Sequence, residues 1–308
     1  MSATFTLKGI IPPVCTPFTE QHEIDVPSLE KLIDFQLDSG VHGLFMLGST
    51  SETATLTYSQ RVTVLETAIA KAKGRVPIMA GTMDTATERV LEHARAAKAA
   101  GVDALVVTSP FYIRPSQSEI IEHFRIIKQE VGLPIVAYDI PSAVQTKLAR
   151  ETVLTLADEG TIVGLKDSSG DEGNFRGLII AAKSRPNFSI FTGSELIIDG
   201  ILLAGADGSV PGICNVDPHG FVKIYDAVQR GDLATAVAEQ NRIYKLFSII
   251  HCAEPGRMGP TAGALGGFKT ALMLRGIIAT NVPGRPMTRL NEAEVERVRK
   301  IVVEAGLL

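Results

Sequence analysis

Several residue types are scarce in this chain of 308 residues: it has no tryptophan, 6% aromatic residues and three cysteines. Cys15, Cys214 and Cys252 are far apart in the sequence and include no CxxC pair, which offers no disulfide framework and favours a reducing compartment. We therefore expect a cytoplasmic protein whose core consists mainly of leucine, isoleucine, valine and alanine.

Long apolar runs and a strong charge of one sign are absent as well. No run approaches the roughly 18 residues needed to span a bilayer, and residues 1–9 lack the charged and apolar regions of a signal peptide. The formal net charge is −4, and lysine and arginine are dispersed rather than gathered into a basic stripe. We expect neither membrane insertion nor a nucleic-acid partner.

Metal-binding motifs are missing too. The six histidines are scattered, and none forms an HxxxH or HxH pair, so the sequence predicts no metal centre. A Mg²⁺-dependent aldolase nevertheless stays open as an alternative, because four carboxylates follow apolar runs: Glu52, Asp139, Asp167 and Glu195.

Hydrophobic residues make up 45% of the chain, and many lie in short apolar runs separated by amphipathic segments. Most of these runs are too continuously apolar for a one-sided sheet, which is typical of parallel strands buried on both faces. The expected strands are residues 10–16, 43–49, 77–82, 104–110, 134–140, 162–168, 189–195 and 208–213.

The segments between these runs carry helix signals. Thr85 with Glu88 and Ser116 with Glu119 have the spacing of a capping box. Glycines that commonly end a helix in the left-handed conformation follow at Gly40, Gly74, Gly101 and Gly132. Regular strand–helix repeats favour a closed (β/α)8 TIM barrel over an open doubly wound sheet, and we place this barrel over residues 1–230.

Residues 231–308 predict a helical C-terminal extension. A helix is expected over 232–250, a glycine-rich turn region over 255–267, and two further helical stretches after it. The motif Gly266-Gly267-Phe268-Lys269-Thr270 is superficially similar to a phosphate loop, but a phenylalanine separates glycine from lysine and no strand clearly precedes it. We interpret the motif as the start of a helix.

Lys166 is the first candidate for chemistry. In such barrels the active site lies at the carboxyl ends of the strands, and Lys166 closes an apolar run, which places its amine at the barrel mouth. Because burial disfavours the charged form, such an amine can act as a nucleophile and form an imine with a carbonyl. The structural alternative is a lysine paired with Asp167 or Glu195.

Two further features accompany this lysine. Tyr138 closes the preceding strand, where its phenol can transfer protons, although a core tyrosine is the alternative. The segment Gly48-Ser49-Thr50-Ser51-Glu52 places hydroxyls and backbone donors at a strand-to-helix turn, which suits a carboxylate but is also ordinary turn chemistry. Tyr138 and Lys166 support each other as a catalytic pair.

These residues, in this order, resemble the dihydrodipicolinate synthase and N-acetylneuraminate lyase family of pyruvate-dependent class I aldolases, over essentially the whole chain. The resemblance implies a barrel with a helical C-terminal domain, commonly a homotetramer, and a lysine imine that needs no bound cofactor. Its motifs are Gly48-Ser49-Thr50-Ser51-Glu52, Pro110-Phe111-Tyr112-Ile113-Arg114-Pro115-Ser116-Gln117, Tyr138-Asp139-Ile140-Pro141 and Gly164-Leu165-Lys166-Asp167-Ser168-Ser169.

The resemblance also implies roles for individual residues. Lys166 would form the Schiff base and Tyr138 would transfer protons, while Ser49 and Thr50 would hold the carboxylate of the 2-oxo acid. Thr50 would link Tyr138 towards Tyr112, a tyrosine lent across a subunit interface in many members. Two further residues would line the pocket near the imine: Gly193 and Ser194.

The chain departs from the family pattern at two positions. Ser51 stands where members usually have glycine, and it would carry strain if the turn needs a positive φ there. Ala143 stands where members that use aspartate semialdehyde usually have an arginine, and alanine cannot clamp a second carboxylate. Arg114 or Lys147 are the cations that could replace it.

These departures lead us to expect a retro-aldol or dehydratase reaction on a 2-oxo acid, such as a 2-keto-3-deoxy sugar acid or a sialic-acid-like compound, releasing pyruvate or a related 2-oxo acid. The first alternative is a dihydrodipicolinate synthase that condenses pyruvate with aspartate semialdehyde through a relocated anchor. The second is a non-catalytic barrel in which Lys166 only grips a carboxylate.

Overall fold

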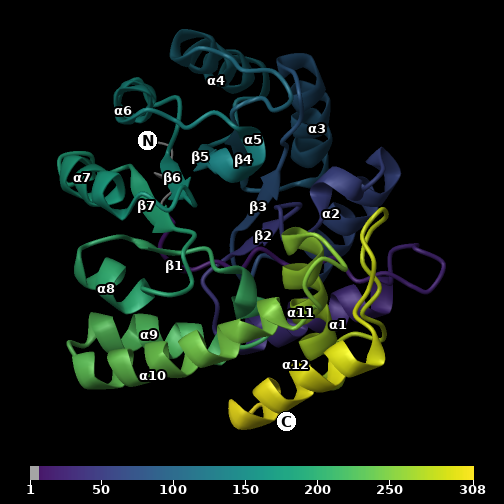
Figure 1. Ribbon diagram of the computed structural model, residues 1–308. Coiled ribbons are helices and arrows are strands. Elements are labelled where there is room, and N and C mark those ends of the chain that lie inside the picture. The colour runs from purple at the N-terminus through teal and green to yellow at the C-terminus, as the bar shows by residue number, and fades with distance from the viewer. Residues whose placement is uncertain (1–6) are drawn as a thin grey trace.

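Eight short parallel strands form one sheet in the computed structural model, which describes residues 7–308 (Figure 1). Residues 1–6, most of the stretch predicted to lack a signal peptide, lie outside the described part. The strands are β1 (Gly9–Ile10), β2 (Leu44–Met46), β3 (Ile78–Gly81), β4 (Ala104–Thr108), β5 (Ile135–Asp139), β6 (Gly164–Asp167), β7 (Ser189–Thr192) and β8 (Gly208–Ser209).

The sheet closes on itself, as the repeats predict. The strand order runs β1-β8-β7-β6-β5-β4-β3-β2, so the two ends of the order are β1 and β2. Just beyond β1, Phe45 of β2 donates its backbone N–H to Pro12 O at 2.9 Å and accepts from Val14 N at 2.9 Å. The predicted (β/α)8 TIM barrel is therefore confirmed.

Each strand lies within its predicted apolar run or one residue before it, but each stops short of the end of that run. The remaining residues leave the ladder and form the rim of the barrel mouth. Among them are the turn after β2, which contains Ser49 and Thr50, and the loop after β7, which contains Gly193 and Ser194.

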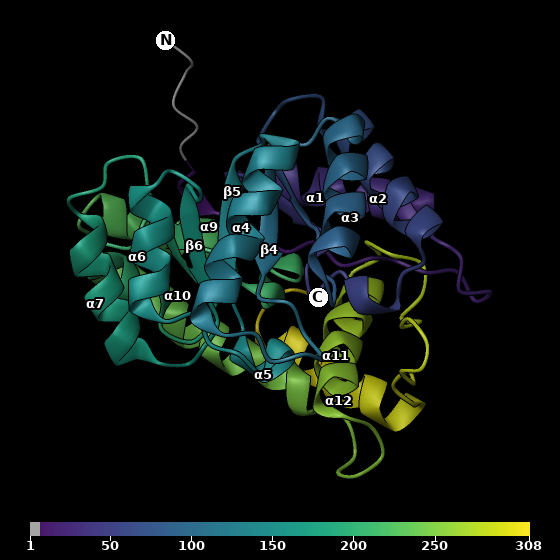
Figure 2. The same ribbon diagram turned by 90° about the horizontal axis from the view of Figure 1, so that it is seen from above.

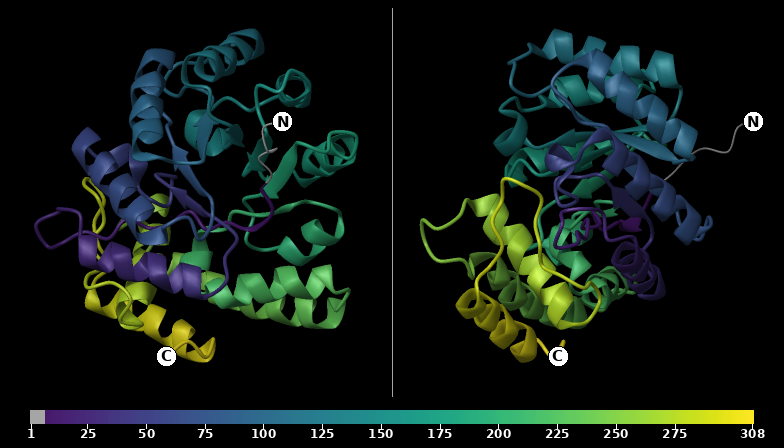
Figure 3. Two further views of the ribbon diagram at one scale, coloured as in Figure 1. Left: turned by 180° about the vertical axis from the view of Figure 1, so that it is seen from behind. Right: turned by 90° about the vertical axis from the view of Figure 1, so that its right-hand side faces the viewer.

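Helices surround the strands and connect them in sequence (Figures 1 and 3). Two of the helices, α5 and α8 in the list that follows, are very short. The 3-10 turn η1 (Thr53–Thr55) follows β2, and the 3-10 turn η2 (Gly212–Asn215) follows β8. The helices are α1 (Val26–Asp38), α2 (Tyr58–Ala72), α3 (Thr87–Ala100), α4 (Gln117–Val131), α5 (Pro141–Val144), α6 (Arg150–Asp158), α7 (Glu172–Ala182), α8 (Ile198–Leu203) and α9 (Pro218–Gln229).

One of the two predicted capping boxes is confirmed. The Ser116 hydroxyl accepts from Glu119 N, and the Glu119 carboxylate accepts from Ser116 N, at the start of α4. The box at Thr85 is wrong: the N–H and hydroxyl of Thr85 both donate to the Asp84 carboxylate, and α3 starts after Ala86. Because the Asp84 carboxylate accepts both hydrogen bonds of Thr85, Thr85 does not cap the helix. The four predicted helix-ending glycines all have positive φ: Gly40, Gly74, Gly101 and Gly132.

Three helices and a 3-10 turn follow α9: α10 (Leu233–Leu246), η3 (Phe247–His251), α11 (Pro260–Leu274) and α12 (Glu292–Glu304). The helical C-terminal end is confirmed, whereas the division at residue 230 stays a prediction, since α10 packs along α9 (Figure 1). In the part of the chain that is described, no helix combines the length and apolar character that crossing a membrane requires.

The predicted glycine-rich turn region over 255–267 is confirmed only in its first part. Residues 255–257 form a turn in which Gly256 has a φ of 78°. The helix start predicted at Gly266 is wrong, because α11 begins at Pro260 and both Gly266 and Gly267 lie inside it. A Cβ at Gly267 would sit 2.4 Å from the carbonyl oxygen of Ile249 in η3, so this glycine serves close helix packing rather than a turn.

Two layers of apolar side chains make up the core. One lies between the strands and the surrounding helices, and the other fills the barrel interior, with Phe45, Tyr138, Phe191 and Val210 among its members. Seen from above, α5 and α11 lie on the same side of the molecule, where the strands end (Figure 2), and both line one pocket. The C-terminal helices thus border the barrel mouth.

Candidate active site

Lys166 lies at the centre of the barrel mouth. It pairs with Tyr138 of β5 and Phe191 of β7 across the sheet, and only 6% of its surface is exposed. Its Nζ lies 4.2 Å from the centre of the Tyr138 ring and 5.3 Å from the centre of the Phe45 ring. The amine is thus enclosed by aromatic faces, as expected for a lysine that closes a buried strand.

No ion pair within residues 7–308 involves Lys166. The two carboxylates suggested as partners are engaged elsewhere: Asp167 Oδ1 accepts from Ser169 N at 2.8 Å, and Glu195 Oε1 accepts from Gly212 N at 2.8 Å. Burial raises the pKa of Glu195, and the Lys166 charge partly opposes that rise. The structure therefore does not show the alternative in which Lys166 is a structural lysine paired with Asp167 or Glu195.

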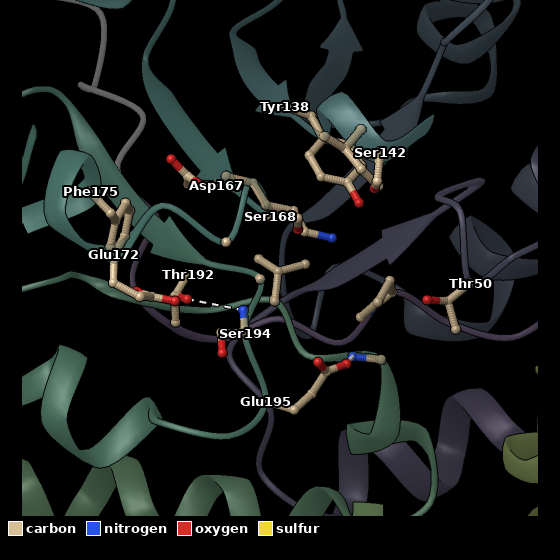
Figure 4. Close-up of a pocket in the computed structure, with 17 residues that line it drawn as sticks. Thr50, Tyr138, Ser142, Asp167, Ser168, Glu172, Phe175, Thr192, Ser194 and Glu195 are labelled. Carbon is tan, nitrogen blue, oxygen red and sulfur yellow. Dashed lines mark hydrogen bonds between the residues drawn. The ribbon is translucent and has the colours of Figure 1, made fainter. Parts of the chain in front are cut away.

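Lys166 lines a cavity of about 370 Å³, and Figure 4 shows this pocket. Five of the predicted site residues line it: Thr50, Tyr138, Lys166, Gly193 and Ser194. Figure 4 shows the hydroxyls of Tyr138 and Ser142 on one side of this space and Glu195 on another. Because the lining comes from the loops after several different strands, the barrel places side chains from distant parts of the sequence around one amine.

Several lining residues were not predicted: Ser142, Ser168, Glu172, Thr192 and Gly212. Thr192 closes the seventh strand, and its Oγ1 accepts from Ser194 N at 3.0 Å (Figure 4). The rule that selected Lys166, a polar residue at a strand end, also applies to Thr192. Ser142 and Glu172 lie in the first turns of α5 and α7, where the sequence carries no comparable signal.

Two hydrogen bonds of the Ser51 hydroxyl fix the turn after β2. The Ser51 hydroxyl donates to Val14 O at 2.5 Å and accepts from Gly48 N at 3.1 Å, which ties the turn to the barrel wall. Positive φ falls on Leu47 and Glu52, at 57° and 61°, and not on Ser51. The strain considered for a serine here does not arise.

A second cavity of about 570 Å³ adjoins the first, and the two share Ile140 and Ser142 as lining residues. Ser49 and Ala143 line this second cavity rather than the first, so the structure separates them from the other predicted site residues. Neither proposed substitute for a clamping arginine reaches in: Lys147 Nζ pairs with Asp139 at 2.9 Å, and Arg114 donates to Gln145.

Tyr112 lies outside both cavities. Its side chain is 91% exposed and its φ is 71°, and among the described residues no hydrogen bond joins it to Thr50 or joins Thr50 to Tyr138. The hydroxyl chain expected from the resemblance is therefore not formed within one copy of the chain.

The four carboxylates considered for Mg²⁺ are held by separate partners. Glu52 forms a buried ion pair with Lys269, which the sequence did not predict, and Asp139 pairs with Lys147. Burial raises the pKa of Asp139, and Lys147 opposes that rise. Over residues 7–308, no three His, Cys, Asp or Glu side chains gather in a way that could hold a metal ion.

A comparison with family models matches residues 6–305 to the dihydrodipicolinate synthetase family. The chain belongs to this family. A 4-hydroxy-tetrahydrodipicolinate synthase of Methanoculleus marisnigri is 34% identical over 301 residues, which cover 97% of this chain and 99% of that protein. A protein of that name from Syntrophus aciditrophicus is 31% identical over 98% of this chain and 99% of its own length.

Solved structures of the family agree with the fold. YagE, a prophage protein of Escherichia coli K12 solved in complex with pyruvate, superposes with a TM-score of 0.92 at 28% identity, over 99% of this chain and all of that one. The chloride-inhibited dihydrodipicolinate synthase of Acinetobacter baumannii, also complexed with pyruvate, gives 0.89 at 29% identity, over 98% of this chain and all of that one.

Membership of the dihydrodipicolinate synthetase family confirms the resemblance noted in the sequence. Members are class I enzymes that form a lysine Schiff base, so this chain is a lyase of that class. The alternative of a barrel that only binds carboxylates does not fit this membership.

Proposed function

We propose that Lys166 forms an imine with C2 of a 2-oxo acid such as pyruvate, and that the chain cleaves or dehydrates larger 2-oxo acids. One observation carries the proposal: a buried lysine amine at the base of a cavity, against the Tyr138 ring and without a carboxylate partner. An amine that has no carboxylate partner can add to the carbonyl of a 2-oxo acid bound in this cavity without first breaking an ion pair.

The chemistry follows from this placement. The Lys166 amine adds to the C2 carbonyl, and loss of water gives the imine. In a retro-aldol reaction the C3–C4 bond breaks, its electrons move into the imine to give an enamine, and the C4 hydroxyl loses its proton as the aldehyde leaves. Protonation at C3 and hydrolysis release pyruvate and restore the amine. No bound cofactor is required.

Tyr138 is the proposed proton carrier, because its ring lies directly against the amine and its hydroxyl faces the cavity. Thr50 and Ser49 are proposed to hold the substrate carboxylate from the turn after β2. Gly193 and Ser194 are proposed to line the pocket beside the imine, since both border the cavity.

Tyr112 is proposed to act from a neighbouring copy in a homotetramer. Its side chain is 91% exposed and Ile113 beside it is 51% exposed, so this loop offers an apolar surface for contact. We also propose a cytoplasmic location, on the cysteine usage described above.

The distal part of the substrate is proposed to be neutral and hydroxyl-rich, as in a 2-keto-3-deoxy sugar acid. The first cavity is lined by the hydroxyl residues Ser142, Ser168, Thr192 and Ser194, and Lys166 is the only lysine or arginine among its lining residues within 7–308. Within the same range, the second cavity is lined by Ala143 and by no lysine or arginine. A second carboxylate on the substrate would therefore meet no clamp.

A synthase that condenses pyruvate with aspartate semialdehyde is the second candidate, favoured by the names of the relatives described above. Two assays separate the candidates: one follows dihydrodipicolinate formation from that pair, and one follows pyruvate release from 2-keto-3-deoxy sugar acids. Efficient turnover in the first and none in the second would overturn our substrate class.

The imine itself is tested by incubating the protein with pyruvate, reducing with borohydride and locating the adduct by mass spectrometry. We expect the pyruvyl mass on the peptide that contains Lys166, and no adduct in Lys166→Ala. Active wild-type protein without an adduct would contradict the Schiff-base mechanism.

A further inference from the structure

A second lysine, Lys269, is completely buried in the middle of α11. It forms an ion pair with Glu52, and neither side chain has any exposed surface. Its Nζ also donates to Val282 O at 2.9 Å and lies 4.3 Å from the centre of the Phe18 ring. Burial lowers the pKa of Lys269, and the Glu52 charge opposes this effect. The proposed function gives this lysine no role.

Glu52 belongs to the turn that carries the proposed carboxylate-binding hydroxyls. Its backbone N–H donates to Ser49 O at 3.0 Å, and its φ of 61° is left-handed. Its Oε2 accepts from Gly284 N at 2.5 Å, so one carboxylate joins this turn both to α11 and to the segment that follows α11. A Cβ at Gly284 would lie 2.2 Å from Thr55 Oγ1, which shows how closely the two segments pack.

The turn is therefore held from two sides. Ser51 ties it to Val14 on the barrel wall, and Glu52 ties it to Lys269 in the C-terminal helices. Thr50 directly precedes these two residues and lines the cavity that Lys166 also lines. None of the described contacts of Lys269 involves Lys166 or Tyr138.

We propose that Lys269 is a positioning residue that acts through Glu52 to hold Ser49 and Thr50 in place for the substrate carboxylate. This inference rests on the proposed function, because it needs a 2-oxo acid bound as an imine at Lys166. It gives the helical C-terminal end a part in substrate binding.

The physical reason is the uncompensated charge that remains when the pair is broken. A buried carboxylate without its partner is strongly destabilising, and it relaxes by turning towards water. The backbone of Glu52 is left-handed and hydrogen-bonded to Ser49, so any backbone movement that accompanies this turning is passed on to Ser49. The carboxylate-binding turn would then shift, while the strand that carries Lys166 would stay in place.

The experiment compares borohydride trapping of two carbonyl compounds, pyruvate and hydroxyacetone, at Lys166. Pyruvate has a carboxylate and hydroxyacetone has none, so only pyruvate uses the turn. In Lys269→Met we expect the pyruvate concentration for half-maximal trapping to rise about tenfold or more, while the second-order trapping rate for hydroxyacetone changes less than about twofold.

Removing both charges provides the rescue. In Lys269→Met with Glu52→Gln, no buried charge is left unpaired, and the glutamine oxygen can still accept from Gly284 N. We expect half-maximal trapping by pyruvate to return to within about threefold of the wild type. If Lys269→Met alone does not fold, the double variant is compared with Lys269→Met carrying Glu52→Ala, which also leaves no buried charge but removes the side chain that accepts from Gly284 N, and which should show the same selective loss of pyruvate.

Arg257→Met is the matched control. It breaks another ion pair of a carboxylate with no exposed side-chain surface, Glu294, in the C-terminal part of the chain, and neither residue lines the cavity. It should lower the melting temperature without altering the trapping of either compound. A parallel loss of pyruvate and hydroxyacetone trapping in Lys269→Met, or no loss at all, would overturn the positioning role. Failure of pyruvate trapping in the wild type would instead refute the proposed function.

Discussion

Two buried lysines of this chain have opposite surroundings. Lys166 is the last residue but one of β6, lines a cavity and has two aromatic rings near its amine, while Glu195 accepts a hydrogen bond from the backbone of Gly212. Lys269 lies inside α11 with its amine paired to Glu52 and bonded to Val282 O. Burial alone therefore does not distinguish the two lysines. Lys166, the proposed nucleophile, differs from Lys269 in lining a cavity and in having no carboxylate partner among the described residues.

The most direct test of this difference between Lys166 and Lys269 is to substitute each lysine in turn. Lys166→Ala deletes the atom that we propose to form the imine, so we expect kcat/KM for 2-oxo acid cleavage to fall by about 1,000-fold or more, with no adduct after reduction. The melting temperature should change little, because no ion pair is broken. An active Lys166→Ala enzyme would move the nucleophile elsewhere.

Tyr138→Phe tests the aromatic face and the hydroxyl separately. Phenylalanine keeps the ring against the Lys166 amine but cannot transfer a proton, so we expect kcat to fall about 100- to 1,000-fold. The adduct with pyruvate should still form at equilibrium, although more slowly. Unchanged turnover in this variant would make Tyr138 a core residue whose only role is to pack against the lysine.

Substitution of the paired lysine, Lys269, should change the stability of the protein rather than its chemistry. Breaking the Lys269–Glu52 pair with Lys269→Met should lower the free energy of unfolding by about 3 kcal/mol, because a buried carboxylate loses its partner. The double variant with Glu52→Gln should recover a large part of that loss. Urea unfolding measures both, and equal losses in the single and double variants would contradict an interaction between the two residues.

The contrast also shows what could be read from the sequence. Lys166 and Tyr138 were predictable because each closes a continuous apolar run, and in a parallel barrel such positions lie at the mouth. The same periodicity placed the eight strands. The family resemblance then supplied Thr50, Gly193 and Ser194, which line the cavity together with Lys166.

The rest depended on contacts between distant segments. Lys269 pairs with Glu52 from the far end of the chain, and no local pattern marks such a pair. The glycines of α11 looked like turn residues because their close contact with η3 is not visible in the sequence. Ser51 looked like a source of strain, but its hydroxyl bonds to Val14 and the positive φ falls on its neighbour.

The smallest expected effect concerns Glu195, the carboxylate that lies near Lys166 without pairing with it. Burial raises its pKa above the ordinary value of 4.5. A raised pKa in the folded state means that this group stabilises the protein fully only below the unfolded pKa, and that the stabilisation is lost as the pH rises through the folded pKa. At neutral pH the buried Glu195 carboxyl group therefore opposes folding.

Glu195→Gln should accordingly raise the free energy of unfolding at neutral pH by about 1 kcal/mol, since the amide oxygen can still accept from Gly212 N. The gain should shrink as the pH falls through and below 4.5, the ordinary pKa, because the carboxyl of the wild type is then protonated in both states. Thermal unfolding over a pH series measures this difference. A gain that stays constant with pH would mean that packing, rather than an unpaired buried charge, distinguishes Glu195 from Glu52.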